Sequence, residues 1–487
     1  MKYQPTVGLE IHIELNTKTK MFCDCLNDPN ERKPNINICP ICMGHPGTMP
    51  VINKEAVNKV IKTGLALNCH IPCFSKFDRK NYFYPDLPKG YQISQYDKPL
   101  CEKGYLEIGN KKIGITRVHL EEDTGRLIHP EGADYSLVDF NRAGIPLMEL
   151  VTEPDLHSAG DARKFAEELR LILKYLDVSD VDMEKGQMRI EVNVSLSDSK
   201  ELGTKVEIKN LNSFRAVEKA IEHEIKRQSK ILESGKKVVQ ETRGWDAIKE
   251  ITKGQREKES AHDYRYFPEP DLPPIEWKEE DINVVKAALP ELPQQKRERF
   301  SREYELLDKD IEIFVINKDL GEYFEKVISE LEPKLAHQEL LEITKLTSNY
   351  LITDLQGLLG KAPHQYTGGG LITPENFAEF VGLIHKNTIS SKIAKIILPE
   401  MFRTGADPSH IIEEKGLAQI TDQNEVEKAV REIIAQNQKA VEDLKRGKEN
   451  AFQFLIGQVM AKTKGRANPD SVKDLLKKTL DKKKKDL

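Results

Sequence analysis

The stretch Val7-Gly-Leu-Glu-Ile-His-Ile-Glu-Leu15 decides how the first part of this chain folds. Apolar and polar side chains alternate along it, and a β-strand places alternate side chains on opposite faces. The apolar set is Leu9, Ile11, Ile13 and Leu15, and the polar set is Glu10, His12 and Glu14. A half-solvated antiparallel strand has the same pattern, so this stretch alone predicts a strand and not yet a site.

The same alternation recurs in three other stretches, Ile115–Asp123, Arg189–Ser195 and Lys205–Lys209. Their polar positions include Arg117 and His119, then Arg189 and Glu191 with Asn193, and finally Lys205, Glu207 and Lys209. We therefore expect one antiparallel sheet, in an α+β domain, whose polar face carries carboxylates, a histidine and cations. Mg²⁺ prefers oxygen ligands, and lysine and arginine suit phosphate oxygens. Such a face predicts a site for Mg²⁺ and ATP.

Length and composition set the organisation of the chain. With 487 residues and a net charge of −5, it is long enough for roughly three domains and too acidic to coat nucleic acid non-specifically. No apolar run approaches the roughly 20 residues of a membrane helix, and the start lacks the apolar core of a signal peptide. We expect a cytoplasmic protein with no membrane contact, in three parts: 1–293, 294–405 and 406–487.

Helical spacing separates these parts. Within 1–293, Asp161–Leu176 and Ser213–Glu233 each carry one apolar stripe, so they predict helices that pack on the sheet, with Ser158 capping the first. After the Pro290–Pro293 linker the pattern is helical throughout. The predicted helices are Gln294–Leu307, Ile313–Leu331, Gln338–Leu359 and Pro374–Ile384, followed beyond Gly405 by a helical tail that reaches Leu480.

Four of the seven cysteines lie in two close pairs, Cys23-x-Cys25 and Cys39-Pro-Ile-Cys42. Two such pairs separated by a loop can surround one tetrahedral Zn²⁺ with four thiolates, and a site of four protein ligands leaves no position for substrate. We expect a structural zinc site in an insertion at about residues 20–45. Coincidental cysteines are the alternative.

Two loops mix aromatic and basic residues, Phe77–Gln95 and Asp263–Pro274. Tyrosines beside arginine or lysine can stack unpaired bases and hold phosphates, as single-stranded RNA ends require. A rigid aromatic turn packed on the core explains the same residues equally well. The chain has neither a P-loop nor a dinucleotide-binding glycine motif, so bound ATP is held in another way.

Long motifs in these segments resemble the family of B subunits of the bacterial aspartyl/glutamyl-tRNA amidotransferases. They are Val7–His12, Cys39–Gly44, Asp78–Asp86, His119–Gly125, Asp139–Leu147, Glu207–Phe214, Gln240–Arg243, Asp263–Asp271, Phe454–Met460 and Gly465–Pro469. The resemblance covers essentially the whole chain in the family's order.

The resemblance implies a function. Members convert Glu on tRNA(Gln), or Asp on tRNA(Asn), into the amide by phosphorylating the side-chain carboxylate with ATP and admitting ammonia. It also implies a glutamine-synthetase-like cradle domain, a YqeY-like tail that binds tRNA, and a heterotrimer. The partners would be an amidase-type A subunit, which releases the ammonia from glutamine, and a small C subunit.

Carried over residue by residue, the resemblance implies Mg²⁺ ligands and phosphate contacts. The expected Mg²⁺ ligands are Glu10, His12 and Glu122, with Glu121 as the alternative to Glu122. Glu191 and Glu207 would support a second ion or ordered waters, although the family usually has Asp at the position of Glu191. Lys80, Arg142 and Arg189 are expected at phosphate, and Cys23, Cys25, Cys39 and Cys42 match the zinc-bearing branch.

Two other functions stay open at this point. The archaeal relative carries an inserted synthetase-like domain, for which there is no room after Pro293. A non-catalytic RNA-binding protein with a zinc knuckle and a basic tail would explain the cysteines and Lys482–Lys485. That second alternative leaves the repeated polar strand faces unexplained.

Overall fold

The computed structural model describes most of the chain. The described residues are 2–257, 264–331, 335–360, 372–417, 423–445, 448–463 and 465–485. They form two compact units, Met1–Pro293 and Gln294–Leu487, and the predicted Pro290–Pro293 linker lies at the boundary between them. The predicted division at Gly405 stays a prediction.

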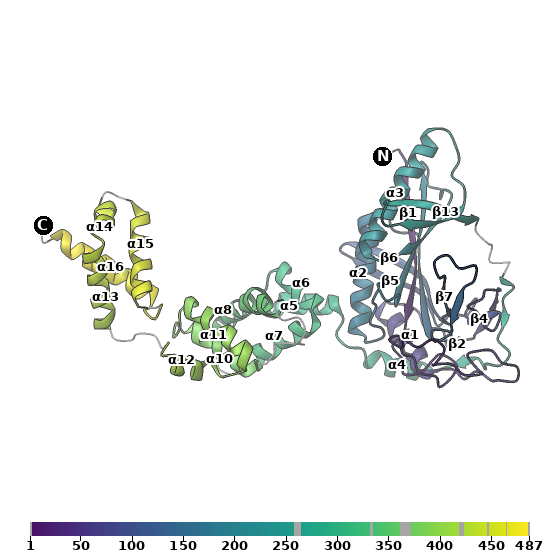
Figure 1. Ribbon diagram of the computed structural model, residues 1–487, viewed down its shortest axis with the longest axis horizontal. Coiled ribbons are helices and arrows are strands. Elements are labelled where there is room, and N and C mark those ends of the chain that lie inside the picture. Colours follow the sequence, from purple (N-terminus) through teal and green to yellow (C-terminus); the bar gives the residue numbers. More distant parts are fainter. Residues whose placement is uncertain are drawn as a thin grey trace. The chain divides into compact units, whose positions relative to one another are not determined.

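An eight-stranded sheet organises the first unit (Figure 1). Across the sheet its strands are β13 (Ile251–Glu257), β12 (Glu241–Asp246), β11 (Val206–Leu211), β10 (Met188–Ser197), β1 (Gln4–Glu14), β9 (Pro146–Thr152), β6 (Lys111–Glu122) and β5 (Cys101–Ile108). Neighbours pair antiparallel, except that β11 and β12 run parallel.

The four strands expected from the sequence all belong to this sheet. β11, β10 and β1 are direct neighbours, and β6 lies on the far side of β9. The sequence prediction did not include β9, because its run Pro146-Leu-Met-Glu-Leu-Val-Thr152 is apolar at nearly every position. A strand buried on both faces shows no alternation, and this removes the signal that identified the other strands.

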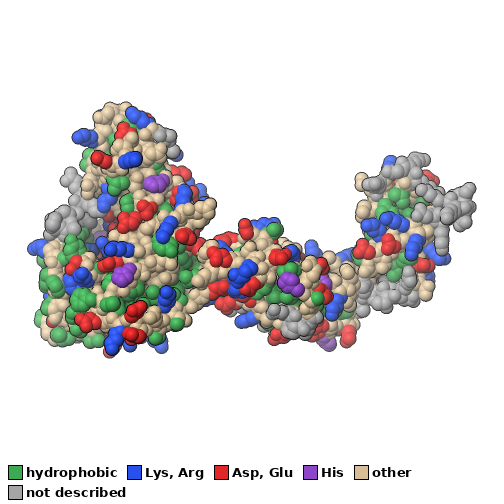
Figure 2. Space-filling model, turned by 180° about the vertical axis from the view of Figure 1, so that it is seen from behind, with side chains coloured by type: hydrophobic (Ala, Val, Ile, Leu, Met, Phe, Trp, Pro, Cys, Tyr) green, Lys and Arg blue, Asp and Glu red, His purple; other side chains and the backbone are tan. Residues whose placement is uncertain are grey.

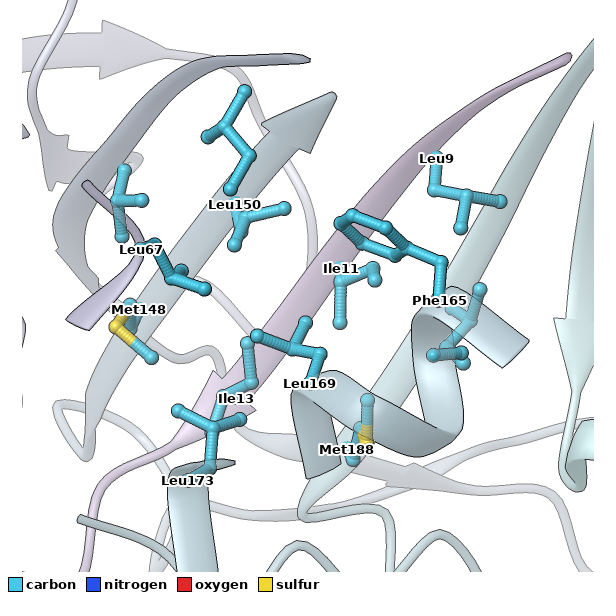
Figure 3. Close-up of a cluster of buried hydrophobic side chains, with 14 of the residues drawn as sticks. Leu9, Ile11, Ile13, Leu67, Met148, Leu150, Phe165, Leu169, Leu173 and Met188 are labelled. Carbon is cyan, nitrogen blue, oxygen red and sulfur yellow. The ribbon is translucent and has the colours of Figure 1, made fainter. Parts of the chain in front are cut away.

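The apolar face of the sheet is covered by α1 (Lys54–Ala66), α2 (Ala159–Tyr175) and α3 (Phe214–Glu233), which contribute to one core with the strands. Figure 3 shows the α2 side chains over those of β1: Phe165, Leu169 and Leu173 against Leu9, Ile11 and Ile13. The predicted cap is confirmed, because the Ser158 hydroxyl accepts a hydrogen bond from the Asp161 amide at 3.1 Å. Ser213 caps α3 in the same way.

Shorter elements lie outside the large sheet. They are β2 (Phe74–Ser75), β3 (Asp78–Asn81), β4 (Tyr91–Ser94), β7 (Arg126–Ile128), β8 (Leu137–Asp139), β14 (Phe267–Pro268), β15 (Ile275–Glu276) and α4 (Glu279–Ala287). β14 pairs with β3, and this joins the two aromatic loops that are far apart in the sequence. Asp263, the first residue of the second loop, lies outside the described residues.

The second unit is helical. Its described helices are α5 (Pro293–Tyr304), α6 (Asp308–Ile316), α7 (Lys318–Leu331), α8 (His337–Asn349), α9 (Gln356–Leu359), α10 (Pro374–His385), α11 (Ser391–Thr404), α12 (Pro408–Glu414), α13 (Gln423–Gln436), α14 (Gln438–Lys445), α15 (Glu449–Lys462) and α16 (Pro469–Lys485). The predicted helix Ile313–Leu331 is two helices that meet at Asn317. A π-helical segment, Tyr350–Leu355, interrupts the predicted helix Gln338–Leu359.

The coarse fold prediction is confirmed: a mixed α/β region with a large sheet precedes a helical C-terminal region. The likeness to glutamine synthetase stays a prediction. On the face that Figure 2 shows, acidic and basic side chains are interspersed over the first unit. Among the described residues, no helix is both long and apolar enough to span a membrane. The side chains of Lys482–Lys485 lie outside the described part.

Candidate active site

The register of the sheet gathers polar side chains on the face opposite the helices. His12 of β1 lies across from Glu149 of β9, and Glu149 lies across from His119 of β6. Residues directly opposite one another in antiparallel strands point to the same face. The same face therefore receives Glu10 from β1 and, two residues beyond His119, Glu121.

Distances show how closely these groups approach. The Nε2 atom of His12 lies 3.4 Å from a Glu149 oxygen and 3.9 Å from a Glu121 oxygen. The Nε2 atom of His119 lies 3.5 Å from Glu149 and 3.7 Å from Glu121. Glu149 thus bridges the two histidines, and it is not among the site residues predicted from the sequence. Its signal was a single carboxylate inside an otherwise apolar run.

A second set of carboxylates continues the group on the other side of β1. Glu10 lies across from Glu191 of β10, and ligand oxygens of Glu10, Glu191 and Glu207 fall within 4.8 Å of one another. Lys209 donates to Glu191 at 2.9 Å, and the Thr242 hydroxyl donates to Glu207 at 2.7 Å. We call Glu10, His12, His119, Glu121, Glu149, Glu191 and Glu207 the carboxylate–histidine group.

The electrostatics of this group indicate a shortage of positive charge around Glu10, whereas the histidines and Lys80 hold the pKa of Glu149 below its ordinary value. Burial and the charge of Glu149 raise the pKa of Glu10. Burial acts to lower the pKa of His12, but its hydrogen bond to Glu149 and the nearby carboxylates raise that pKa to about 9. Mutually repelling carboxylates that hold histidine as the cation are the setting in which a divalent ion binds. Oxygen and imidazole ligands within 4.8 Å of one another fit Mg²⁺.

Glu121 and Glu122 are neighbours in the sequence and point in opposite directions. Glu122 faces away from the carboxylate–histidine group: Lys89 forms an ion pair with it, and the Ile93 amide donates to it at 2.9 Å. The structure therefore does not bring the expected ligand Glu122 to Glu10 and His12, and it brings the alternative Glu121 there. The physical reason is that β6 pairs with β9 without interruption from Arg117 to Glu122, so no bulge changes the alternation.

The three expected phosphate contacts lie in two places. Lys80 is beside the carboxylate–histidine group: burial acts to lower its pKa, but Glu121 and Glu149 hold that pKa above the ordinary value. Arg142 and Arg189 lie at the end of the sheet, where both approach Asp123, at 3.4 and 2.7 Å. The buried Nε atom of Arg189 has no hydrogen-bond partner among the described residues. An unsatisfied guanidinium nitrogen suits an anion.

A cavity of about 930 Å³ opens beside these arginines. Its lining includes Glu191 and Lys209 of the carboxylate–histidine region, and also the cations Arg32, Arg126, Arg142, Lys185 and Arg189. Small-molecule sites commonly measure roughly 300–1,000 Å³. The cavity therefore has the size for a phosphorylated ligand, its lining combines six basic with six acidic side chains, and it borders the candidate metal ligand Glu191.

The four paired cysteines also meet. The Sγ atoms of Cys23, Cys25, Cys39 and Cys42 lie within 4.8 Å of one another, and we call them the thiol group. Four sulfurs around zinc, each at about 2.3 Å from it, are separated by about 3.8 Å, so the geometry fits. The Cys39 amide donates to the Cys42 sulfur at 3.1 Å. Gly44 completes this turn with φ of 68°, a conformation that favours glycine.

The surroundings favour the thiolate form of one member of the thiol group, Cys42, whereas burial raises the pKa of Cys25 to about 11. A hydrogen bond from Cys23 and the Lys20 ammonium lower the pKa of Cys42 to about 5. Lys20 is fully buried, with its Nζ 3.8 Å from the Cys42 sulfur and 3.3 Å from the Phe140 carbonyl oxygen. A buried ammonium is stable only next to negative charge, which thiolate ligands provide.

Comparison with known proteins agrees with the motifs. Residues 5–283 match the family described as "GatB/GatE catalytic domain", and residues 322–480 match "GatB domain". The chain is 50% identical over 492 residues to the B subunit of the aspartyl/glutamyl-tRNA(Asn/Gln) amidotransferase of Caldanaerobacter subterraneus subsp. tengcongensis. It is 50% identical over 491 residues to that of Caldicellulosiruptor saccharolyticus and 49% over 492 to that of Thermotoga maritima. Each alignment covers 99% of this chain and 100% of the relative. The chain belongs to the family of B subunits of the aspartyl/glutamyl-tRNA(Asn/Gln) amidotransferases.

Proposed function

We propose that this chain is the subunit of a glutamine-dependent carbon–nitrogen ligase that converts misacylated tRNA into its amidated form. Its substrates are Glu-tRNA(Gln), Asp-tRNA(Asn) or both, and its products are Gln-tRNA(Gln) and Asn-tRNA(Asn). The observation that carries the proposal is the carboxylate–histidine group beside the cavity lined by Arg142 and Arg189, in a chain that matches the family over its full length.

The metal ligands in this proposal differ from those expected from the sequence: Glu121 takes the place of Glu122, and Glu149 and His119 are added. Glu10, His12 and Glu149 would hold one Mg²⁺, with Glu121 and His119 close to the shared ligand Glu149, and Glu10, Glu191 and Glu207 would hold a second. In the second set Glu191 already has a cationic partner, because the Lys209 ammonium lies 2.8 Å from its carboxylate. When bound, the metal would neutralise the phosphoryl group during its transfer.

The chain's own side chains would orient the two reactants. Arg142, Arg189 and Lys209 line the cavity in which the ATP phosphates would lie. Lys80 lies beside Glu121 and Glu149, where it can approach the substrate carboxylate. A fixed array of cations lowers the barrier, because the charge that develops on the phosphoryl oxygens is already compensated.

The chemistry takes two steps. An oxygen of the side-chain carboxylate attacks the γ-phosphorus of ATP; the bond to the β-phosphate oxygen breaks and ADP leaves. Ammonia then attacks the acyl carbon of the resulting acyl phosphate, inorganic phosphate departs with the electron pair of the broken C–O bond, and the nitrogen loses a proton. A carboxylate is a poor acyl donor, and the phosphate converts it into a good one.

The ammonia would come from an amidase-type A subunit, braced by a small C subunit. Ser390-Ser-Lys392, which superficially resembles an amidase motif, has a structural role here. The Ser390 hydroxyl caps α11 and donates to the Gly465 carbonyl oxygen at 2.8 Å. The thiol group would hold a structural Zn²⁺, and residues 406–487 would bind the body of the tRNA.

The test is a reconstituted heterotrimer supplied with ATP, glutamine and each misacylated tRNA in turn. We expect ATP consumption only with charged tRNA, and hydroxylamine in place of ammonia should trap the acyl phosphate as a hydroxamate. Glu149→Gln should abolish both signals. Tight tRNA binding with no turnover of either substrate would instead identify a non-catalytic RNA-binding protein.

A further inference from the structure

Five tyrosines from two distant parts of the chain form a continuous series of ring contacts. Tyr82, Tyr84 and Tyr96 come from the first aromatic loop and its end, and Tyr264 and Tyr266 come from the second. Successive ring centroids lie 6.5 Å (Tyr84–Tyr82), 5.9 Å (Tyr82–Tyr264), 6.1 Å (Tyr264–Tyr266) and 4.3 Å (Tyr266–Tyr96) apart. We call this series the tyrosine ladder.

The two ends of the ladder are open, whereas its middle is partly buried. Tyr84 is 54% exposed and Tyr96 is 51% exposed. Tyr96 stacks flat on Tyr266, with 11° between the ring planes, so one face of Tyr96 is covered by a ring. A flat aromatic ring with an exposed side is the surface on which an unpaired base stacks.

Specific contacts hold the ladder in place. Asn81 donates to the backbone carbonyl oxygens of Tyr264 and Arg265, at 3.2 and 2.8 Å. Arg79 binds the Glu269 carboxylate through two nitrogens, at 2.7 and 2.8 Å. Burial raises the pKa of Tyr266 to about 12, so this ring stays neutral at physiological pH. The rings are thus positioned before any ligand arrives, which reduces the entropy lost on binding.

The ladder passes directly beside the proposed reaction site. The Nζ atom of Lys80 lies 5.1 Å from the centre of the Tyr264 ring and 5.9 Å from that of Tyr82. The same ammonium is held by the charges of Glu121 and Glu149, both members of the carboxylate–histidine group. The middle rings thus lie close to these carboxylates, and each exposed end ring contacts a middle ring, Tyr84 on Tyr82 and Tyr96 on Tyr266.

Both ATP and the 3′ end of tRNA carry an adenine that could stack on the ladder. The charges around the ladder distinguish the two. Lys80 is the inward cation that touches the ladder, and the two next to it along the strand region are already paired: Arg79 with Glu269 and Asp271, and Lys76 with Asp78 and Asp97. A triphosphate needs several cations close together, and six basic side chains line the cavity around Arg142 and Arg189. Exposed Arg265 lies between two ladder tyrosines and suits the single charge of a diester phosphate.

We propose that the tyrosine ladder binds the 3′-terminal adenosine of the acylated tRNA by stacking, and that this places the aminoacyl side chain at the carboxylate–histidine group. The inference rests on the proposed function and adds to it the place where the RNA end is held.

A thermodynamic cycle tests this proposal with the complete heterotrimer and uncharged tRNA that ends either in CCA or in CC. For the wild type, we expect removal of the terminal adenosine to weaken binding about tenfold, the typical effect of one stacked base. Tyr96→Ala and Tyr84→Ala should weaken binding of the CCA form, and at least one should no longer distinguish CCA from CC. Tyr96→Phe keeps the ring and should behave as wild type. Tyr135→Ala, which removes a 61% exposed tyrosine elsewhere, should keep the tenfold difference.

Several outcomes would overturn the proposal. If both alanine variants keep the full CCA-to-CC difference, the ladder does not contact the terminal base. If they raise the KM for ATP and leave tRNA binding unchanged, the ladder holds the adenine of ATP. These results are distinct from a failure of the proposed function, because that failure would appear as absent turnover in the wild type.

Discussion

The two candidate metal sites of this chain are carried by different kinds of backbone. The carboxylate–histidine group lies on neighbouring strands of the large sheet. Hydrogen bonds between the strands and packing of the core hold the backbone that carries these side chains. The thiol group lies in a segment without regular secondary structure, between β1 and α1. One site is therefore held open by the fold, whereas the other holds a segment of the fold together.

This difference has a physical origin. A site that binds substrate must keep coordination positions free, so rigid strands must resist the repulsion among its carboxylates. A structural zinc site is filled by its four thiolates, and the energy of binding orders the loop itself. Removing one ligand should therefore abolish activity at the first site and destabilise the local structure at the second.

The largest effect is expected at the bridging carboxylate. Glu149→Gln should lower kcat by at least about 10²-fold, because the negative charge that Glu149 contributes between the two histidines is lost. His119, His12 and Lys80 stabilise the ionised Glu149 carboxylate and hold its pKa well below the ordinary value, so the variant should still fold but unfold at a lower temperature. Steady-state amidation and thermal unfolding measure the two quantities. Glu153→Gln, an exposed carboxylate just beyond β9, is the matched control. Full activity in Glu149→Gln would exclude this residue from the site.

Loss of one cysteine of the thiol group should strongly destabilise the structure around it. Cys39→Ser, or a strong chelator, should release one zinc per chain and make residues 20–45 sensitive to protease, with a stability loss on the order of several kcal/mol. Manganese binding at the carboxylate–histidine group should persist. Cys73→Ser, which changes an exposed cysteine, should retain the zinc. Equal zinc content in Cys39→Ser and the wild type would contradict the structural role.

The neighbours Glu121 and Glu122 offer a direct comparison. Glu121→Gln should weaken Mn²⁺ binding roughly 10–100-fold, whereas Glu122→Gln should leave it within about twofold, since only Glu121 faces the group. Titration calorimetry of each variant measures the affinity. The opposite ranking would mean that β6 carries a bulge that the present register lacks.

The last comparison concerns Glu14, which lies on the same strand as Glu10 and His12 and affects stability and not activity. Burial, together with Asp123, raises its pKa to about 8 from the ordinary 4.5. The folded state thus holds a proton that the unfolded state releases, so stability is full below about pH 4.5 and falls as pH rises to about 8. Glu14→Gln should flatten the decline in the free energy of unfolding, an effect on the order of a few kcal/mol. Denaturant unfolding at several pH values measures it. Glu184→Gln, on the same cavity, should keep the wild-type slope.

Periodicity predicted much of the architecture, because alternation and helical spacing are local properties. The strand around Glu10, the helix capped by Ser158 and the two cysteine pairs all follow from short stretches of sequence. The strand that carries Glu149 was not predicted, since a run buried on both faces has no alternation of apolar and polar residues. The break at Asn317, which divides the predicted helix Ile313–Leu331 into two, was also not predicted, because the apolar stripe continues across it.

The sequence by itself determined which residue types are available and which of them share a strand face: Glu10 with His12, and Arg189 with Glu191. It also carried the family motifs that indicate the reaction. Only the tertiary structure decided which strands become neighbours, and therefore that Glu149 bridges two histidines while Glu122 turns towards Lys89. The reason is that strand order and register are set by contacts between residues far apart in the chain, which no local pattern encodes.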